Sequence, residues 1–169
     1  MLIPKIIGFR NTSLTKDLSV EEKKELNSEL LKTNLTRNRN LSALLFVVFA
    51  ILLYTDYLNS VKGLWVEVPG YKLLFIVHLV LTIGLGIFLL YYFIARINST
   101  STKSVHKQIF IIGSSYFCVI CSSFTSVADQ YIHGEIIVFI MALLTYAIAL
   151  TLRPLVSFWM YSIAYVIFV

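Results

Sequence analysis

The 169-residue chain is 58% hydrophobic and only 14% charged, with a mean hydropathy of +0.82. Soluble domains are about 45–50% apolar and about 25% charged, so this composition excludes an ordinary soluble protein and predicts an integral membrane protein. The net charge of +5 comes from basic residues beside apolar runs, a pattern typical of membrane orientation rather than of nucleic-acid binding.

Residues 1–40 predict a polar leader on the cytoplasmic side. Ser19 and Glu22 have the spacing of a capping box, which predicts a helix over about 20–33. Leu26, Leu30 and Leu31 give this helix a weak apolar stripe. We therefore expect a short amphipathic helix that either fades between residues 33 and 40 or continues into the first span. It could lie on the membrane surface or pair with a second copy in a homodimer, and a solvated leader that only sets topology would have the same sequence.

Residues 41–169 predict an all-α, polytopic membrane helix bundle. A span needs about 20 mostly apolar residues, and five runs reach or approach that length. The expected spans are 41–57, 73–95, 109–128, 136–152 and 155–169. The fifth run reaches Val169, and we expect a sixth span to follow it. Pro154 suits the first position of the fifth helix, directly after a very tight turn.

Lysine and arginine alternate between the connecting segments. The segments before the first span, after the second and after the fourth are basic, whereas the other two are neutral or acidic. This alternation predicts a multi-pass protein of the cell membrane with a cytoplasmic N-terminus, whose main partner is the lipid bilayer.

His78 is the one ionisable residue well inside an expected span. It shares a helix face with Thr82 and Gly86, which should look into the bundle. Ionisable residues inside a membrane are functional candidates, so His78 could sense protons, contact a ligand or bind a metal. The alternative is a neutral imidazole that hydrogen-bonds to a neighbouring helix.

The third span carries a polar stripe with three- and four-residue spacing. Its members are Ser115, Cys118, Ser122, Thr125 and Asp129. The stripe favours close helix packing, with hydroxyls that bond across the contact, and a polar cavity shared with His78 is the alternative. Cys118 and Cys121 form a C-x-x-C in mid-membrane, where we interpret both as small apolar residues.

A polar cluster is expected on the outer side, between the third and fourth spans. It consists of Asp129, Gln130, Tyr131, His133 and Glu135. With Asp56, Tyr57 and Trp65 from the first outer connection, it could form a recognition patch for a small molecule or ion, a divalent cation included. A short solvated loop would contain the same residues.

Two segments resemble a known family. The stretch from Asp129 to Ile136 (DQYIHGEI) and the later Leu152-Arg153-Pro154-Leu155 resemble the multi-span input regions found ahead of bacterial GGDEF diguanylate cyclase domains. In such regions the membrane part senses a cue and the cytoplasmic domain makes cyclic di-GMP. The resemblance implies that Asp129, Gln130 and Gly134 form the outer turn, while the chain itself contains no cyclase residues.

We therefore expect a membrane-embedded sensory module that regulates a C-terminal cytoplasmic effector, with His78, Asp129, Gln130, His133 and Glu135 as candidate sensing residues. No P-loop, zincin motif, nucleophile elbow or kinase signature occurs, so the sequence predicts no enzyme, and it assigns neither a cofactor nor a metal site. A fragment of a transporter or channel is the alternative, in which Gly84 and Gly86 could break the second span. An intramembrane enzyme would need ionisable groups paired at matching depth, and we expect the candidates to lie at different depths.

Overall fold

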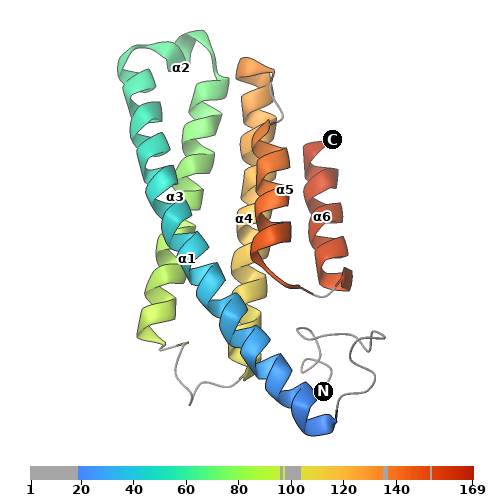
Figure 1. The fold of residues 1–169 in the computed structure, drawn as a ribbon. Coiled ribbons are helices and arrows are strands. Elements are labelled where there is room, and N and C mark those ends of the chain that lie inside the picture. The colour runs from blue at the N-terminus through green and yellow to red at the C-terminus, as the bar shows by residue number, and fades with distance from the viewer. Residues whose placement is uncertain (1–18, 96, 98–103, 135–136, 153) are drawn as a thin grey trace.

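A computed structural model describes residues 19–95, 97, 104–134, 137–152 and 154–169 (Figure 1). Within these ranges the chain forms helices and no strands, which confirms the all-α prediction. The helices are α1 (Val20–Val61), α2 (Leu64–Glu67), α3 (Gly70–Ile94), α4 (Ser104–His133), α5 (Ile137–Ala149) and α6 (Pro154–Phe168).

The long helices α1, α3 and α4 run side by side, and the shorter α5 and α6 pack against α4 (Figure 1). Successive long helices run in opposite directions. We call the end of the bundle that holds α2 and the α4–α5 connection the upper end. The opposite end, where α3 finishes and α4 begins, is the lower end.

Helix α1 is continuous over 42 residues. It starts with the capping box, in which the Glu22 N–H donates to Ser19 Oγ and the Ser19 N–H donates to Glu22 Oε2. The predicted helix end near residue 33 is wrong, and the alternative in which the helix continues into the first span is correct. No glycine or proline lies between Val20 and Val61, so nothing in the sequence breaks the helix there. It ends at Val61, and two residues later Gly63 has a φ of 81°, a conformation that favours glycine.

Helix α3 passes through Gly84 and Gly86 without a break. A Cβ atom at Gly84 would lie 2.1 Å from Cζ of Phe117 on α4, so the glycine allows the two helices to approach closely. At Gly86 a Cβ atom would lie 3.3 Å from the ring of Phe46 on α1. The two glycines are therefore packing positions in this structure, rather than the helix breaks that a transporter could use.

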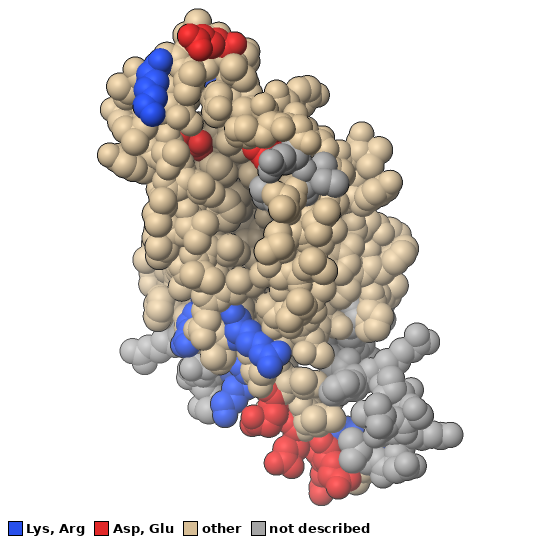
Figure 2. Space-filling view, turned by 45° about the horizontal axis from the view of Figure 1, so that its top comes forward, with Lys and Arg blue, Asp and Glu red and all other residues tan. Residues whose placement is uncertain are grey.

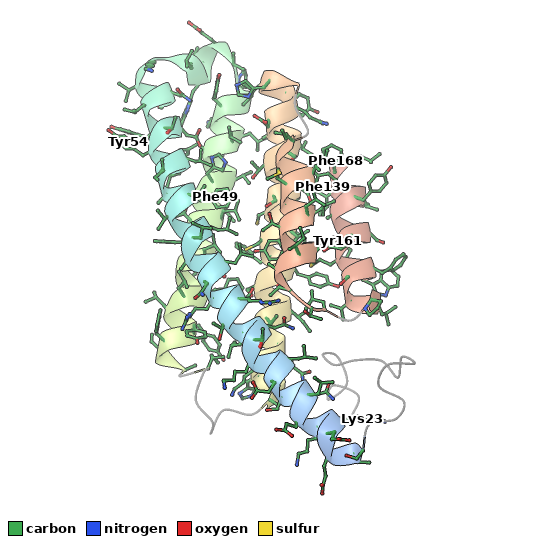
Figure 3. The ribbon with its side chains drawn as sticks, in the orientation of Figure 1. Lys23, Phe49, Tyr54, Phe139, Tyr161 and Phe168 are labelled. Atoms are coloured by element: carbon green, nitrogen blue, oxygen red, sulfur yellow. The ribbon has the colours of Figure 1, made fainter. Side chains whose placement is uncertain are left out.

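The other expected spans differ from the helices mainly at their ends. Helix α4 begins at Ser104 rather than at 109 and ends at His133 rather than at 128, because polar residues continue the helix beyond the apolar run. Helices α5 and α6 each pack mainly against α4 and meet through an aromatic pair. Phe139 and Phe168 stack with their ring centroids 4.3 Å apart (Figure 3).

The surface of the bundle fits a membrane protein. Helices α1, α3 and α4 are long and apolar enough to cross a membrane, whereas α5 has 13 residues and α6 has 15. Many large apolar side chains are exposed around the bundle. In Figure 2 the acidic and basic residues gather towards the two ends of the visible face and leave a broad uncharged band between them.

Candidate functional site

The centre of the candidate site is a buried pair of ionisable residues between α1 and α3. Nδ1 of His78 lies 2.6 Å from Oδ2 of Asp56, and each side chain is only 5% exposed. An imidazole N–H that donates to a carboxylate satisfies two groups which apolar surroundings would otherwise leave unpaired. The pair therefore ties the upper part of α1 to the middle of α3.

The spacing of buried residues explains why these two side chains meet. On α1, Ser42, Phe49 and Asp56 are buried and recur every seven residues. On α3, buried residues recur at three- and four-residue intervals, and they include His78 and Leu85. Two helices with such a repeat face each other along one seam, as in a coiled coil, and the seam brings the carboxylate opposite the imidazole.

Two neighbouring side chains on the same helices form part of the pair's surroundings. The ring of Phe49 lies 5.5 Å from the imidazole ring, measured between centroids. Thr82, one turn further along α3, donates from Oγ1 to the carbonyl oxygen of His78. An aromatic ring on one side and the helix seam on the other shield the pair from solvent.

The structure corrects the expected place of Asp56. The sequence interpretation put Asp56 in an outer connection, as part of a recognition patch, but α1 continues to Val61 and Asp56 is buried within it. Asp56 and His78 also lie at the same depth, contrary to the expectation that the ionisable candidates occupy different depths. The signal that could have identified the pair is the seven-residue spacing from Phe49 to Asp56.

The predicted outer cluster lies at the upper end, where α4 finishes. Nδ1 of His133 lies 2.7 Å from Oδ1 of Asp129, one turn earlier on the same helix, and the ring of Tyr71 from α3 meets the His133 ring edge-on at 6.2 Å. The His133 side chain is half exposed and Gln130 is exposed, whereas Glu135 lies outside the described residues. Within the described ranges, no three His, Cys, Asp or Glu side chains come close enough to hold a metal ion.

The polar stripe of α4 is largely a packing surface. Ser115, Cys118, Ser122 and Thr125 are buried, as a bundle-facing stripe requires. The hydroxyls of Ser115 and Thr125 donate to carbonyl oxygens one turn back on α4, rather than across to another helix as the sequence analysis expected. Such a bond within the helix satisfies a hydroxyl where the neighbouring helix offers only apolar groups.

Two buried asparagines of α1 are functional candidates that the sequence analysis did not identify. Nδ2 of Asn34 donates to the carbonyl oxygen of Thr151 and the Thr151 N–H donates to Oδ1 of Asn34, both at 3.0 Å. One turn further on, Nδ2 of Asn38 donates to Oγ of Ser114 on α4 at 2.7 Å. Thr151 lies between α5 and α6, where its backbone has no helical partner, so the amide of Asn34 supplies both missing hydrogen bonds.

The polarity of residues 34–40 predicts part of a polar leader, and that prediction includes no contact between these side chains and the bundle. Both asparagines are essentially inaccessible, with exposed fractions of 0% for Asn34 and 1% for Asn38. The four-residue spacing of Asn34, Asn38 and Ser42 is the sequence signal that could have revealed a polar face directed into the bundle.

Comparison of the chain with known protein families, with curated proteins and with solved structures gives no match.

Proposed function

We propose that this chain is the membrane-embedded input module of a signalling protein. In the proposed topology α1, α3, α4, α5 and α6 cross the membrane, the N-terminus is cytoplasmic, and the lower end of the bundle faces the cytoplasm. The alternation of basic and neutral connections supports this orientation, as does the band of lysine and arginine at the lower end of Figure 2. The short α5 and α6 would be accommodated by local thinning of the bilayer.

The observation that carries the proposal is the length of α1. At 1.5 Å per residue its 42 residues extend about 63 Å, roughly twice the hydrocarbon thickness of a bilayer. The helix bears Asp56 near its upper end, and its first turns carry Glu21, Glu22 and Glu25 beyond the lower end of the bundle. A change at the buried pair can therefore move a segment that lies on the opposite side of the membrane.

The proposed signal acts at the upper end. The last turns of α4, at the upper end, carry Asp129, Gln130 and His133. The ring of Tyr71 contacts His133 there, and Tyr71 lies at the start of α3, the helix that carries His78. A small molecule or ion bound there would alter the position of α3 and hence the contact with Asp56. The effector is proposed to be a cytoplasmic domain C-terminal to this region, as the resemblance to input regions of GGDEF cyclases implies.

The test of this function is the output of the whole gene product in cells. Asp56→Asn keeps the size of the side chain but removes its charge, and it should change the cellular level of cyclic di-GMP severalfold. Tyr54→Phe is the matched control, because Tyr54 lies two residues before Asp56 on α1 and is exposed. An Asp56→Asn protein that is present at normal amounts and gives the parent output would refute the proposal.

A transporter or channel fragment is the second candidate, and the buried pair itself favours it. Carboxylate and imidazole groups inside apolar helices occur in proton pathways. Proteoliposomes that contain a pH-sensitive dye would test this function. Proton flux that Asp56→Asn abolishes supports transport, whereas liposomes as tight as protein-free ones refute it.

A further inference from the structure

Among the described residues, three polar side chains of α1 hydrogen-bond to other elements, and each is followed, one turn later, by another polar residue. Asn34 is followed by Asn38, Asn38 by Ser42, and Asp56 by Ser60. We call these residues, Asn34, Asn38, Ser42, Asp56 and Ser60, the polar ladder. Three of them have partners on other elements: Asn34 bonds to Thr151 after α5, Asn38 to Ser114 on α4, and Asp56 to His78 on α3.

We propose that α1 has a second register, in which it is displaced by one helical turn towards the lower end of the bundle. Each residue of α1 would then take the place of the residue four positions before it, a movement of about 6 Å. Asn38 would face Thr151, Ser42 would face Ser114, and Ser60 would face His78. Every polar partner would thus keep a hydrogen-bonding neighbour, which is the condition for a helix to have two discrete positions rather than a continuous range.

The opposite displacement has no such support. If α1 moved by one turn towards the upper end, Leu30 would face Thr151 and Leu52 would face His78. The backbone of Thr151 would then lose both of its hydrogen bonds to α1, and the buried His78 would have no partner, which is costly for a buried polar group. The ladder therefore assigns a direction to the movement as well as a step length.

An unpaired atom in the present register also fits the second one. Oδ1 of Asn38 is buried and accepts no hydrogen bond here, while its Nδ2 donates to Ser114. Opposite Thr151, the same amide would use both of its atoms, as Asn34 does now. The present register thus leaves in Asn38 an acceptor that the second register would satisfy.

The connection between α1 and α3 can supply the chain length that the step needs. Helix α2 has four residues, no side-chain hydrogen bond at its N-terminus, and no buried residue. Four helical residues span about 6 Å and four extended residues about 13 Å, so unwinding α2 releases about 7 Å. That length matches the one-turn displacement, and α3 could stay in place.

The second register is the movement by which the proposed input module would act. The existence of the two registers does not depend on the proposed function, and only their role in signalling rests on it. The two proposals can fail separately. A second register could exist in a protein without an effector, and α1 could pass on a signal by tilting in a single register.

Cross-linking between α1 and α3 distinguishes the registers in the full chain in nanodiscs. Phe46 lies over Gly86 in the present register, and Ala50 would lie there after the proposed step. Phe46→Cys with Gly86→Cys therefore reports the first register, and Ala50→Cys with Gly86→Cys the second. Ser42→Cys with Gly86→Cys reports the opposite displacement, and so controls for general loosening of α1. Cys118→Ala and Cys121→Ala remove the native thiols, and a short bifunctional thiol reagent forms the cross-link.

Asn34→Ala is the decisive variant. It removes two hydrogen bonds from the first register but none from the second, where position 34 would lie beyond Thr151. The ratio of second-register to first-register cross-links should rise about tenfold. Adding Asn38→Ala should reduce that rise to about threefold, because it removes both bonds to Thr151 from the second register but only the bond to Ser114 from the first. Asp56→Ser gives His78 a serine in both registers and should also raise the ratio, so the test does not depend on the folding of one variant.

Three results would overturn the proposal. The second-register cross-link could stay at the parent level in both Asn34→Ala and Asp56→Ser. The second result is a second-register cross-link that rises equally with and without Asn38→Ala. The third is a cross-link of the Ser42→Cys control pair that rises as much as the second-register cross-link, which would indicate general loosening of α1.

Discussion

The buried pair predicts an unequal cost for removing each partner. In Asp56→Leu the His78 ring loses its hydrogen-bond partner in the seam, which should cost about 1–3 kcal/mol of unfolding free energy. In His78→Leu the carboxylate of Asp56 is left in the seam without its partner, which should cost about 3–5 kcal/mol. Each side chain is 5% exposed, so water cannot take over the missing role in either variant.

The double variant gives the sharper test. Replacing both residues by leucine leaves no buried polar group, and such double replacements are often neutral or stabilising. The cost of Asp56→Leu/His78→Leu should therefore be below the cost of His78→Leu alone, with a coupling energy above about 2 kcal/mol. Hydrogen bonds between membrane helices average only about 0.6 kcal/mol, so a coupling of that larger size indicates a charged contact.

Reversible unfolding of the protein in mixed micelles measures these free energies, with fluorescence of the two tryptophans as the signal. Thr55→Val is a suitable control, because Thr55 is exposed on α1 beside the pair, and its cost should stay below about 1 kcal/mol. The reasoning is refuted if the double variant costs the sum of the two single variants, because the two side chains would then act independently.

Three further predictions concern packing, pH and topology. Gly84→Ala places a Cβ atom 2.1 Å from an aromatic ring of α4, so the unfolding free energy should fall by about 1–3 kcal/mol in the same assay. In the control Gly113→Ala the new Cβ atom meets no atom within 4 Å, so the unfolding free energy should not fall. Equal losses in the two variants would contradict the close approach of α3 and α4 at Gly84. Hydrogen bonds from the backbone and side chain of Ser19 lower the pKa of Glu22 below its ordinary value of 4.5. The Glu22 carboxylate should therefore stabilise the first turn of α1 fully above pH 4.5, and this stabilisation should disappear as the pH falls through the lowered pKa. Amide exchange in the first turn measures this loss, and a Glu22→Gln variant with the same pH dependence would contradict it. A membrane-impermeant maleimide should label Lys62→Cys in intact cells and Glu25→Cys only after lysis, and the reverse pattern would invert the proposed topology.

The helices could be predicted from sequence where the signal is local. The apolar runs, the capping box at Ser19 and the turn at Pro154 depend on neighbouring residues, so the described helices lie close to the predicted ones. The end of the first helix was wrong because polarity near residue 33 was taken as a helix boundary. Polarity marks the edge of the lipid, whereas only glycine, proline or an unsatisfied end would have stopped the helix.

The candidate site depends on which residues face one another across helices, and that information is not local. His78 was identified because an ionisable residue is conspicuous within an apolar run, but its partner Asp56 lies at the edge of another run and looked like a loop residue. Asn34 and Thr151 are 117 positions apart, and the need for their contact appears only once the turn after α5 is placed beside α1. The seven-residue spacing from Phe49 to Asp56 is the property that could have revealed Asp56, and the four-residue spacing of Asn34 and Asn38 could have revealed the polar face that contacts Thr151.

The central claim is that the buried pair near the upper end of α1 controls the position of its lower end. The most direct measurement is the distance distribution between spin labels at Glu25→Cys and His106→Cys, both exposed near the lower end, in nanodiscs and without the native thiols. The proposed function predicts that Asp56→Asn shifts this distribution by several ångströms, up to about 6 Å for a one-turn step. A distribution that stays unchanged in a folded Asp56→Asn protein would contradict the claim and leave the pair with a purely structural role.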